Sequence, residues 1–379
     1  MFLSRGAFVR ALLVSAIAVG APSCSRLRGG RHQTMEMLAV LRERYQAPGI
    51  AAAVFINGRS AFRGGIGVAN LETGMAQDGD TVFSIASISK TMTAVAIMQL
   101  VEAGRVRLDD EIQRYAPWFP RKQRPITVFE LLTHTSGIRH YRDNEDSDSG
   151  QWMNAFRHYQ TLEQATRFWR NDPLLFVPGA FWSYSTYAFT LLQAVVESAS
   201  ATPFELYLLR HVWAPASMTS TRLDVAGRIV PRREQGYFWD DARRHLERSR
   251  DEDDSYKYAG GGILSSDEDL CRFASALNAG VLLKPATVAE MYRPQLAASV
   301  RSFSEPDFVP STGQALTWDC GVDDQGRPYV EHGGDNKGTI SHVINFWQQD
   351  VVAAVHTNVY PSPQLGRAAR NIAGLYLRS

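Results

Sequence analysis

Strand-like runs lie near both ends of this chain of 379 residues, while helical patterns fill its middle. The apolar run 49–56 is followed by Asn57-Gly58 and by a second extended run through Val68, which is typical of a β-hairpin. After about residue 315, extended runs return at 315–322, 340–347 and 351–357, and a last helix begins near Pro363. This order predicts an α/β fold of the α+β type, with one antiparallel sheet built from both chain ends, flanked by helices, and a mainly helical lobe inserted between them.

The same patterns divide the chain into three predicted parts. Residues 1–30 are predicted to be a signal peptide or anchor. Residues 31–83 and 301–379 are predicted to form the α/β sheet lobe. Residues 84–300 are predicted to form the mainly helical lobe.

Several local signals refine this division. A short helix is expected around residues 35–45. Thr127 with Glu130 predicts a capping box at the start of a helix, and Ser266 before an acidic run predicts another start. The polar run 143–150 predicts a solvated loop, with a lid over the substrate as the alternative.

The first thirty residues differ in composition from the rest. Arg5 and Arg10 precede the apolar run 11–19, and no acidic residue occurs before Glu36, which is typical of a secretory signal peptide. We therefore expect an exported protein of the periplasm or medium. A lipid anchor at Cys24 and a mitochondrial transit peptide are the alternatives. No other segment is long enough to span a membrane, so any membrane attachment is expected only through the N-terminus.

Charge and cysteine usage exclude some classes of partner. The chain has 40 basic and 39 acidic side chains, and the basic ones form no concentrated stripe, so we expect no nucleic-acid partner. Cys271 and Cys320 lie in apolar surroundings and are expected to be buried thiols rather than a disulfide. No metal-ligand spacing and no His-Glu-x-x-His motif occur, so we expect neither a metal nor another cofactor.

A serine and a lysine three residues apart open the first long helical pattern. Ser87 and Lys90 would share one face of the helix, where a partly desolvated amine can take the proton of the hydroxyl. The unpaired N-H groups of the first turn would stabilise negative charge on a substrate oxygen. Two further elements follow in order along the chain: Tyr184-Ser185-Thr186 and His332-Gly333-Gly334.

Each of these residues also has a purely structural interpretation. Ser87 could cap a helix, Tyr184 could be a core phenol among aromatic neighbours, and His332 could simply end a strand. Their combination in this order favours catalysis. A Ser-His-Asp triad through His134 is not supported, because the chain has no Gly-x-Ser-x-Gly elbow.

These motifs resemble the serine beta-lactamase and penicillin-binding-protein superfamily, in particular the class C-like branch that includes DD-peptidases, D-aminopeptidases and carboxylesterases. The resemblance covers nearly the whole mature chain and extends to the runs 131–138 and 259–266. Local runs around residues 85–90 and 134–141 are most similar to mitochondrial beta-lactamase-like serine proteases. Because that relative forms filaments, self-assembly is an alternative role.

The resemblance implies a role for each motif residue. Ser87 would be the acylated nucleophile, Lys90 its partner in proton transfer, and Tyr184 a second acid or base. His332 would take the place of the lysine in the usual Lys-Thr-Gly motif. The backbone N-H groups of Ser87 and Asp335 would form the oxyanion hole, the latter on an edge strand. Substrate would contact Thr186, Gly333 and Gly334, while His134 would be structural.

The expected function is an exported serine hydrolase that cleaves an ester or a peptide or amide bond of a small-molecule or peptide-like acyl donor through a Ser87 acyl-enzyme. Thr186 lacks the amide of the usual Tyr-x-Asn motif, and His332 lacks a permanent cation to hold a substrate carboxylate. We therefore expect weak beta-lactamase activity at best. A DD-peptidase or true beta-lactamase is one alternative, and a non-catalytic binding or filament-forming protein of the same fold is another.

Overall fold

The computed structural model describes residues 24–142, 157–304, 313–336, 338–360 and 365–377. The polar run 143–150 and the apolar N-terminal run lie outside the described residues. Among the described residues, no helix combines the length and the hydropathy that crossing a bilayer requires.

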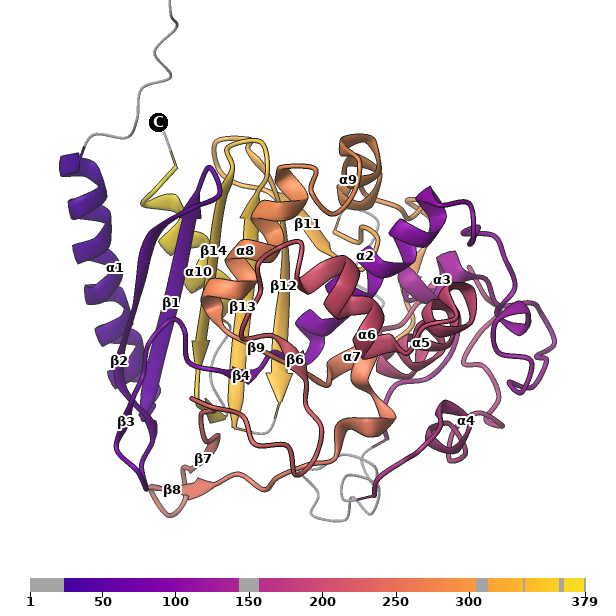
Figure 1. The fold of residues 1–379 in the computed structure, drawn as a ribbon, viewed down its shortest axis with the longest axis horizontal. Helices are drawn as coiled ribbons and strands as arrows, with labels where there is room; N and C mark the ends of the chain where they lie inside the picture. Colours follow the sequence, from indigo (N-terminus) through magenta and orange to yellow (C-terminus); the bar gives the residue numbers. More distant parts are fainter. Residues whose placement is uncertain (1–23, 143–156, 305–312, 337, 361–364, 378–379) are drawn as a thin grey trace, which may run out of the picture.

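The centre of the fold is a seven-stranded antiparallel sheet, which confirms the predicted fold class (Figure 1). Its strands, in spatial order, are β11 (Asp319–Val322), β12 (Pro328–Asn336), β13 (Thr339–Phe346), β14 (Val351–Thr357), β1 (Gly49–Ile56), β2 (Arg59–Asn70) and β3 (Met75–Ala76). The pairing of β1 with β14 joins the two chain ends, with Ile50 opposite Thr357 and Ile56 opposite Val351. Both chain ends therefore build the sheet, as the sequence predicts.

The predicted hairpin joins β1 and β2. Asn57 and Gly58 have φ angles of +50° and +69°, the left-handed conformation that a two-residue type I′ turn requires. Asparagine and glycine adopt it at low cost, which explains why this pair of residues sets the register of the hairpin.

One face of the sheet is covered by α1 (Cys24–Arg44) and α10 (Leu365–Gly374). Leu38 and Ile372 are fully buried there against the apolar side of β1 and β14. Helix α1 also meets the residues after α10 through Thr34 Oγ1 and the Tyr376 hydroxyl, which lie 3.1 Å apart. Helix α1 begins earlier than the expected range 35–45, because its N-terminal turns also pack on the sheet lobe, and it includes residues that we assigned to the signal peptide or anchor.

The other face of the sheet is covered by α8 (Asp267–Asn278), which comes from the segment 84–300. Ser266 caps this helix by accepting a hydrogen bond from the N-H of Asp269, as its sequence predicts. Cys271 is fully buried on the sheet-facing side, with its Sγ 3.4 Å from the carbonyl of Ala53. Cys320, by contrast, is only partly buried, and neither cysteine forms a disulfide within the described residues.

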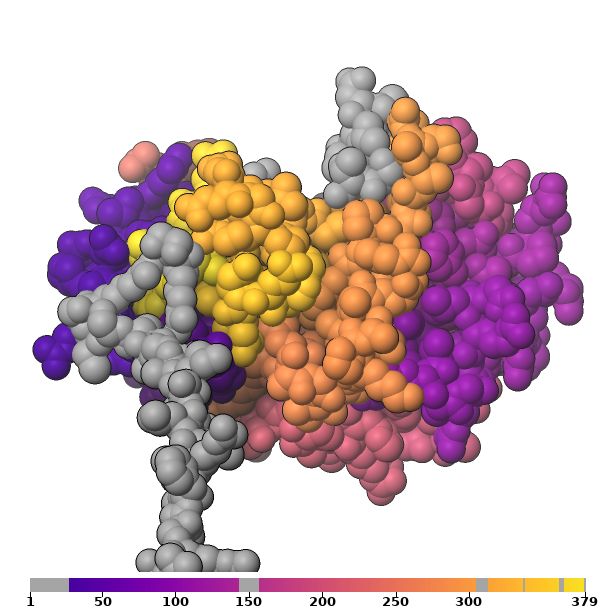
Figure 2. All heavy atoms as spheres, turned by 90° about the horizontal axis from the view of Figure 1, so that it is seen from above, coloured from indigo at the N-terminus to yellow at the C-terminus, as the bar shows by residue number. Residues whose placement is uncertain are grey.

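The helical lobe packs beside the sheet and shares a continuous core with it. In Figure 2 the N- and C-terminal segments gather on one side and residues of the middle of the chain on the other. The helices of this lobe are α2 (Ser89–Glu102), α3 (Val128–Leu132), α4 (Leu162–Ala165), α5 (Thr186–Ser200), α6 (Phe204–Leu208) and α7 (Tyr258–Gly261), and the short helix α9 (Pro285–Tyr292) follows α8. The capping box of Thr127 and Glu130 is present at the start of α3.

Three small sheets connect the two parts of the fold. They consist of β4 (Phe83–Ser84) with β9 (Ile263–Ser265) and β6 (Arg222–Leu223), of β15 (Val359–Tyr360) with β7 (Tyr237–Asp240) and β8 (His245–Arg248), and of β5 (Phe181–Trp182) with β10 (Arg301–Ser302). Strand β4 leads directly into the segment that carries Ser87.

The expected strand 315–322 is shorter than predicted. Only Asp319–Val322 is a strand, because the preceding residues form a tight turn in which the N-H of Ala315 donates to the carbonyl of Trp318 over 2.9 Å. Thr317 reaches a φ of +74° in this turn. The turn places Asp319 at the beginning of β11, opposite Glu331 of β12.

A buried ionic cluster joins α8 to the sheet. His356 of β14 places Nδ1 2.7 Å from Asp267 and Nε2 3.2 Å from Glu234. Burial opposes the charge of His356, but the two carboxylates outweigh it and raise its pKa to about 10. Removing one partner of such a cluster leaves buried charge uncompensated, so the cluster adds to the apolar packing that holds α8 on the sheet.

Candidate active site

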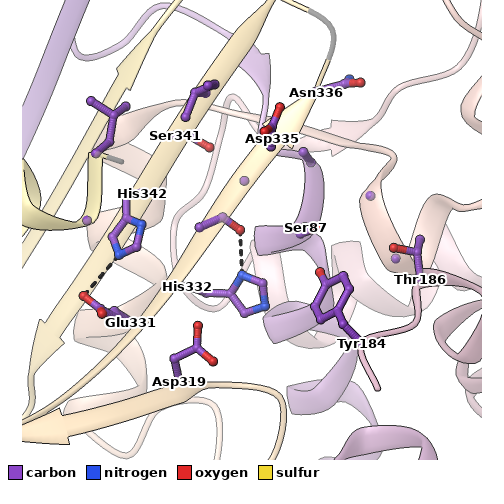
Figure 3. Close-up of a pocket in the computed structure, with 18 of the residues that line it drawn as sticks. Ser87, Tyr184, Thr186, Asp319, Glu331, His332, Asp335, Asn336, Ser341 and His342 are labelled. Atoms are coloured by element: carbon purple, nitrogen blue, oxygen red, sulfur yellow. Dashed lines mark hydrogen bonds and ion pairs between the residues drawn. The ribbon is translucent and has the colours of Figure 1, made fainter. Parts of the chain in front are cut away.

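The predicted nucleophile lies where the chain passes from β4 into α2. Ser87 is the middle residue of a short 3-10 helix, Ala86–Ile88, that continues directly into α2. Ala86 has a φ of +43°, a left-handed conformation that costs a residue with a side chain on the order of 1 kcal/mol. This turn brings Ser87 to the wall of a cleft between the helical lobe and β12 (Figure 3).

Lys90 lies within hydrogen-bond distance of Ser87. Its Nζ is 2.9 Å from Ser87 Oγ and 2.5 Å from the carbonyl oxygen of Gly260 on α7. Burial, and then the positive charge of Lys257, lower the pKa of Lys90 well below its ordinary value. Lys90 is therefore far more readily neutral than a lysine in water, and only the neutral amine can accept a proton.

Tyr184 faces these two residues from the segment before α5. The Nζ of Lys90 lies 4.9 Å from the centre of the Tyr184 ring, and Tyr184 lines the cleft together with Ser87. Burial raises the pKa of Tyr184 above its ordinary value, so at neutral pH the residue is a phenol that can donate a proton. The structure thus brings together two motifs that lie almost a hundred residues apart.

The third motif lies on β12, across the cleft from Tyr184 (Figure 3). His332 Nδ1 donates a hydrogen bond of 2.7 Å to the carbonyl of Gly333, which leaves Nε2 as an acceptor. Burial, and then the charge of Lys90, lower the pKa of His332 to about 3. His332 is therefore a neutral imidazole at neutral pH and offers no positive charge to a substrate carboxylate.

Strand β12 is at the edge of the sheet only where it passes Ser87. Strand β11 pairs with β12 as far as Glu331, so the following residues of β12 have no strand on that side. The edge comes very close to the nucleophile segment: a Cβ on Gly334 would lie 2.2 Å from the carbonyl oxygen of Ile85. Asn336 Nδ2 also donates to Ser84 Oγ over 2.8 Å. Only glycine fits at position 334 in this arrangement.

The remaining predicted site residues lie around this centre. Asp335 and Gly333 line the cleft from β12. Thr186 is at the start of α5, where it is almost fully buried and its backbone N-H donates to His140 Nδ1 over 3.3 Å. His134 lies behind Tyr184, and its Nδ1 accepts the N-H of Ser185 over 3.1 Å. Its contact supports the backbone of the tyrosine motif, which agrees with a structural role.

Sequence reasoning missed several residues of the cleft, whose volume is about 710 Å³. Lys257 lines it and pairs with Glu252 at 3.2 Å and Asp254 at 3.1 Å. Burial opposes the charge of Lys257, but these carboxylates outweigh it and raise its pKa well above the ordinary value. Asp319 was also missed, because neither its neighbours in the sequence nor its spacing forms a motif.

Side chains that could hold a metal ion come together at one place among the described residues. The one group whose ligand atoms lie within 4.8 Å of one another is Asp240, His245 and Glu247, on the β7–β8 hairpin away from the cleft. Arg243 lies 3.6 Å from Asp240 and 3.2 Å from Glu247, so it already offsets their charge. The cleft itself presents a serine, an amine, a phenol and a neutral imidazole, which suit acyl transfer through the serine.

Sequence comparison identifies the family of this chain. Residues 35–377 match the family described as Beta-lactamase. The chain belongs to the beta-lactamase family. This membership confirms the superfamily that the three motifs resemble.

Relatives within the beta-lactamase family cover different shares of the chain. This chain is 29% identical over 352 residues to the human mitochondrial serine beta-lactamase-like protein LACTB, and the match covers 72% of this chain and 64% of that protein. It is 33% identical over 191 residues to the esterase EstB of Burkholderia gladioli, covering 47% of each chain. The chain thus spans less than two thirds of the length of either relative.

Solved structures show the same beta-lactamase-like fold. The octameric penicillin-binding protein homologue from Pyrococcus abyssi superposes with a TM-score of 0.77 at 23% identity, covering 91% of this chain and 77% of that one. The sheet built from both chain ends and the inserted helices are therefore an arrangement that this chain shares with a solved structure.

Proposed function

We propose that this protein is a serine hydrolase that cleaves ester or amide bonds through an acyl-enzyme at Ser87. The observation that carries the proposal is the distance of 2.9 Å between Lys90 Nζ and Ser87 Oγ in a site where burial lowers the pKa of the lysine. A hydroxyl needs a base to become a nucleophile, and a neutral, buried amine is a base at the required distance.

The proposed reaction has two steps. Ser87 Oγ attacks the acyl carbon as Lys90 takes its proton, and the Ser87 N-H and the Asp335 N-H stabilise the negative oxygen. The bond to the leaving group then breaks, and Tyr184 gives that group its proton. Tyr184 recovers a proton from the Lys90 ammonium. Water next attacks the ester of Ser87 and gives one proton to the same pair of residues. The pair returns this proton to Ser87 Oγ as the bond to the acyl group breaks and the acid is released.

The charges around Ser87 favour a substrate without an anchored carboxylate. His332 is neutral, and the ammonium of Lys257 is paired with Glu252 and Asp254. This supports an esterase or amidase rather than an efficient beta-lactamase or DD-peptidase. The relative EstB, an esterase, is consistent with the same choice.

Two further parts of the proposal concern location and assembly. We propose export on the basis of the apolar run after Arg5 and Arg10. Self-assembly is the alternative role, and the octameric homologue from Pyrococcus abyssi gives it a precedent within the fold. Assembly that depends on concentration and survives loss of Ser87 would favour that alternative.

The acyl-enzyme can be tested by mass. We expect brief mixing of the protein with p-nitrophenyl acetate to add one acetyl group per chain, and peptide mapping to place it on Ser87, because this hydroxyl is paired with a buried amine. Ser89, the next serine of the same segment, is the internal control, since it is fully buried. Acetylation elsewhere, or on no serine while the ester remains intact, would refute the proposal.

The close approach of β12 predicts the effect of a single methyl group. Gly334→Ala should lower kcat/KM for ester hydrolysis by about 10- to 100-fold, because its Cβ would overlap the carbonyl of Ile85 and push the strand away from Ser87. Gly374→Ala is the control, since Gly374 lies outside the cleft and an added Cβ there would meet nothing within 4 Å. Equal activity of the two variants would show that the close approach is not required.

A further inference from the structure

Among the cleft residues, Asp319 combines a carboxylate, access to the cleft and no side-chain partner within the described part of the chain. It begins β11 opposite Glu331, and Figure 3 shows its carboxylate between Glu331 and His332, on the His332 side of Tyr184. Its side chain is solvent-accessible and has no hydrogen bond or ion pair to the described residues. A carboxylate in a cleft without a partner calls for an explanation, because most acidic side chains that are partly shielded from water are paired or hydrogen-bonded.

The neighbours of Asp319 do not neutralise it. Across the strand pair, Glu331 is bound by Arg370 at 2.5 Å and by His342 at 3.1 Å, so these groups already serve another acid. His332 is neutral, and Lys257 is bound by its own two carboxylates. Arg367 of α10 also lines the cleft, but it forms no ion pair with Asp319.

The surroundings of Asp319 also make its charge costly. The cleft walls limit its hydration and Glu331 repels it, and these two effects raise the pKa of Asp319 to about 7. A cation bound in the cleft would remove this penalty by pairing with the carboxylate. A second carboxylate, brought in by a substrate, would increase it.

We propose that Asp319 is a specificity-determining residue that binds a protonated amine of the substrate, so that the cleft selects cationic acyl donors such as amino-acyl esters and amides. The proposal rests on the serine hydrolase function proposed above and names its substrate class. A lysine at position 332 would favour a substrate that carries a carboxylate. In this cleft the preference is reversed, because the protein carries the anion and the substrate carries the cation. An ammonium suits this position, because it forms charge-assisted hydrogen bonds to a carboxylate.

The test uses pairs of esters that differ only in one charge. Phenyl esters of glycine, β-alanine and 6-aminohexanoate are compared with their N-acetyl derivatives, and monophenyl adipate supplies a carboxylate. Three amine positions are needed, because the distance from the acyl carbon to the amine is not specified by the proposal. Rates are corrected for spontaneous hydrolysis, and kcat/KM is reported as the ratio of each amine to its N-acetyl partner.

We expect the wild-type ratio to reach at least about tenfold for one or more of the amines and to fall close to one in Asp319→Asn. Asp319→Lys should instead favour monophenyl adipate over the amines. Asp324→Asn is the matched control, since this exposed acid lies in the turn after β11 and does not line the cleft; its ratio should stay at the wild-type value.

A ratio near one for all three amines in the wild type, or a ratio that Asp319→Asn retains, would overturn this proposal while leaving the serine hydrolase intact. Because the readout is a ratio, general damage to the fold lowers both esters and does not imitate the expected result. If neither member of any pair is hydrolysed and Ser87 is not acylated, the serine hydrolase proposal fails, and the assignment of Asp319 fails with it.

Discussion

Ser87→Ala should lower kcat for ester hydrolysis by about 10⁵- to 10⁶-fold and abolish the acyl adduct. The variant keeps Lys90, Tyr184 and the cleft, but the methyl group cannot attack an acyl carbon. The only remaining route is attack by water, helped by whatever stabilisation the backbone N-H groups give to the negative oxygen. Alanine is smaller than serine at a position that contacts the cleft, so the fold should keep its melting temperature within a few degrees.

Ser89→Ala is the matched control for this variant. Ser89 is two residues further along the same segment and fully buried, and its Oγ has no hydrogen-bond partner among the described residues. Its loss should therefore leave hydrolysis near the wild-type rate. If Ser87→Ala kept even one hundredth of wild-type turnover while Ser89→Ala lost it, the assignment of the nucleophile would be wrong.

Lys90→Met should reduce kcat/KM by about 10³-fold, within the range expected for loss of a general base. Methionine replaces the buried stem at similar volume but has no amine, so Ser87 loses the group 2.9 Å away that takes its proton. The Gly260 carbonyl also loses its donor, and we expect a moderate loss of stability in addition. Lys122→Met, at a partly buried lysine outside the cleft, controls for removal of a lysine in general.

The pH dependence separates the base from a structural lysine. Because the pKa of Lys90 is lowered, the amine loses its proton at a lower pH than a lysine in water, and wild-type kcat/KM should rise with pH through that lowered pKa and then level off. Lys90→Met should lack this rise. A variant that retains the wild-type rising limb would show that another group titrates, and Lys90 would then only position Ser87.

Much of the fold could be predicted because its signals are local. The turn at Asn57-Gly58 and the caps at Thr127 and Ser266 each depend on residues within a few positions of one another, and each is present in the structure. The early start of α1 was missed, because its N-terminal half contacts a residue distant in the sequence: Gly30 and Thr34 lie beside Tyr376. The turn before β11 was missed for a similar reason, since an apolar run does not reveal a left-handed residue such as Thr317.

The site shows the same division between local and distant signals. Ser87 and Lys90 lie on one helical face, so their contact follows from spacing alone. Asp319 could not be found in this way, because its significance depends on Glu331 opposite it and on a cleft formed with α2 and α7. The partners of Lys257 are only three and five positions away in the sequence, but the place of these ion pairs at the wall of the cleft exists only in three dimensions.

The pairing of β1 with β14 has a consequence for how the protein acquires its shape. Ile50 lies opposite Thr357, 307 positions later, so the sheet cannot close until nearly all of the chain has been synthesised. Contacts of such long sequence separation carry a large loop-closure entropy and slow the rate of folding. Strand β12, which passes Ser87 at Gly334, also comes from the last sixth of the chain. A nascent chain therefore carries the helix of the proposed nucleophile long before it has the cleft, and the proposed hydrolytic activity can arise only at the end of folding.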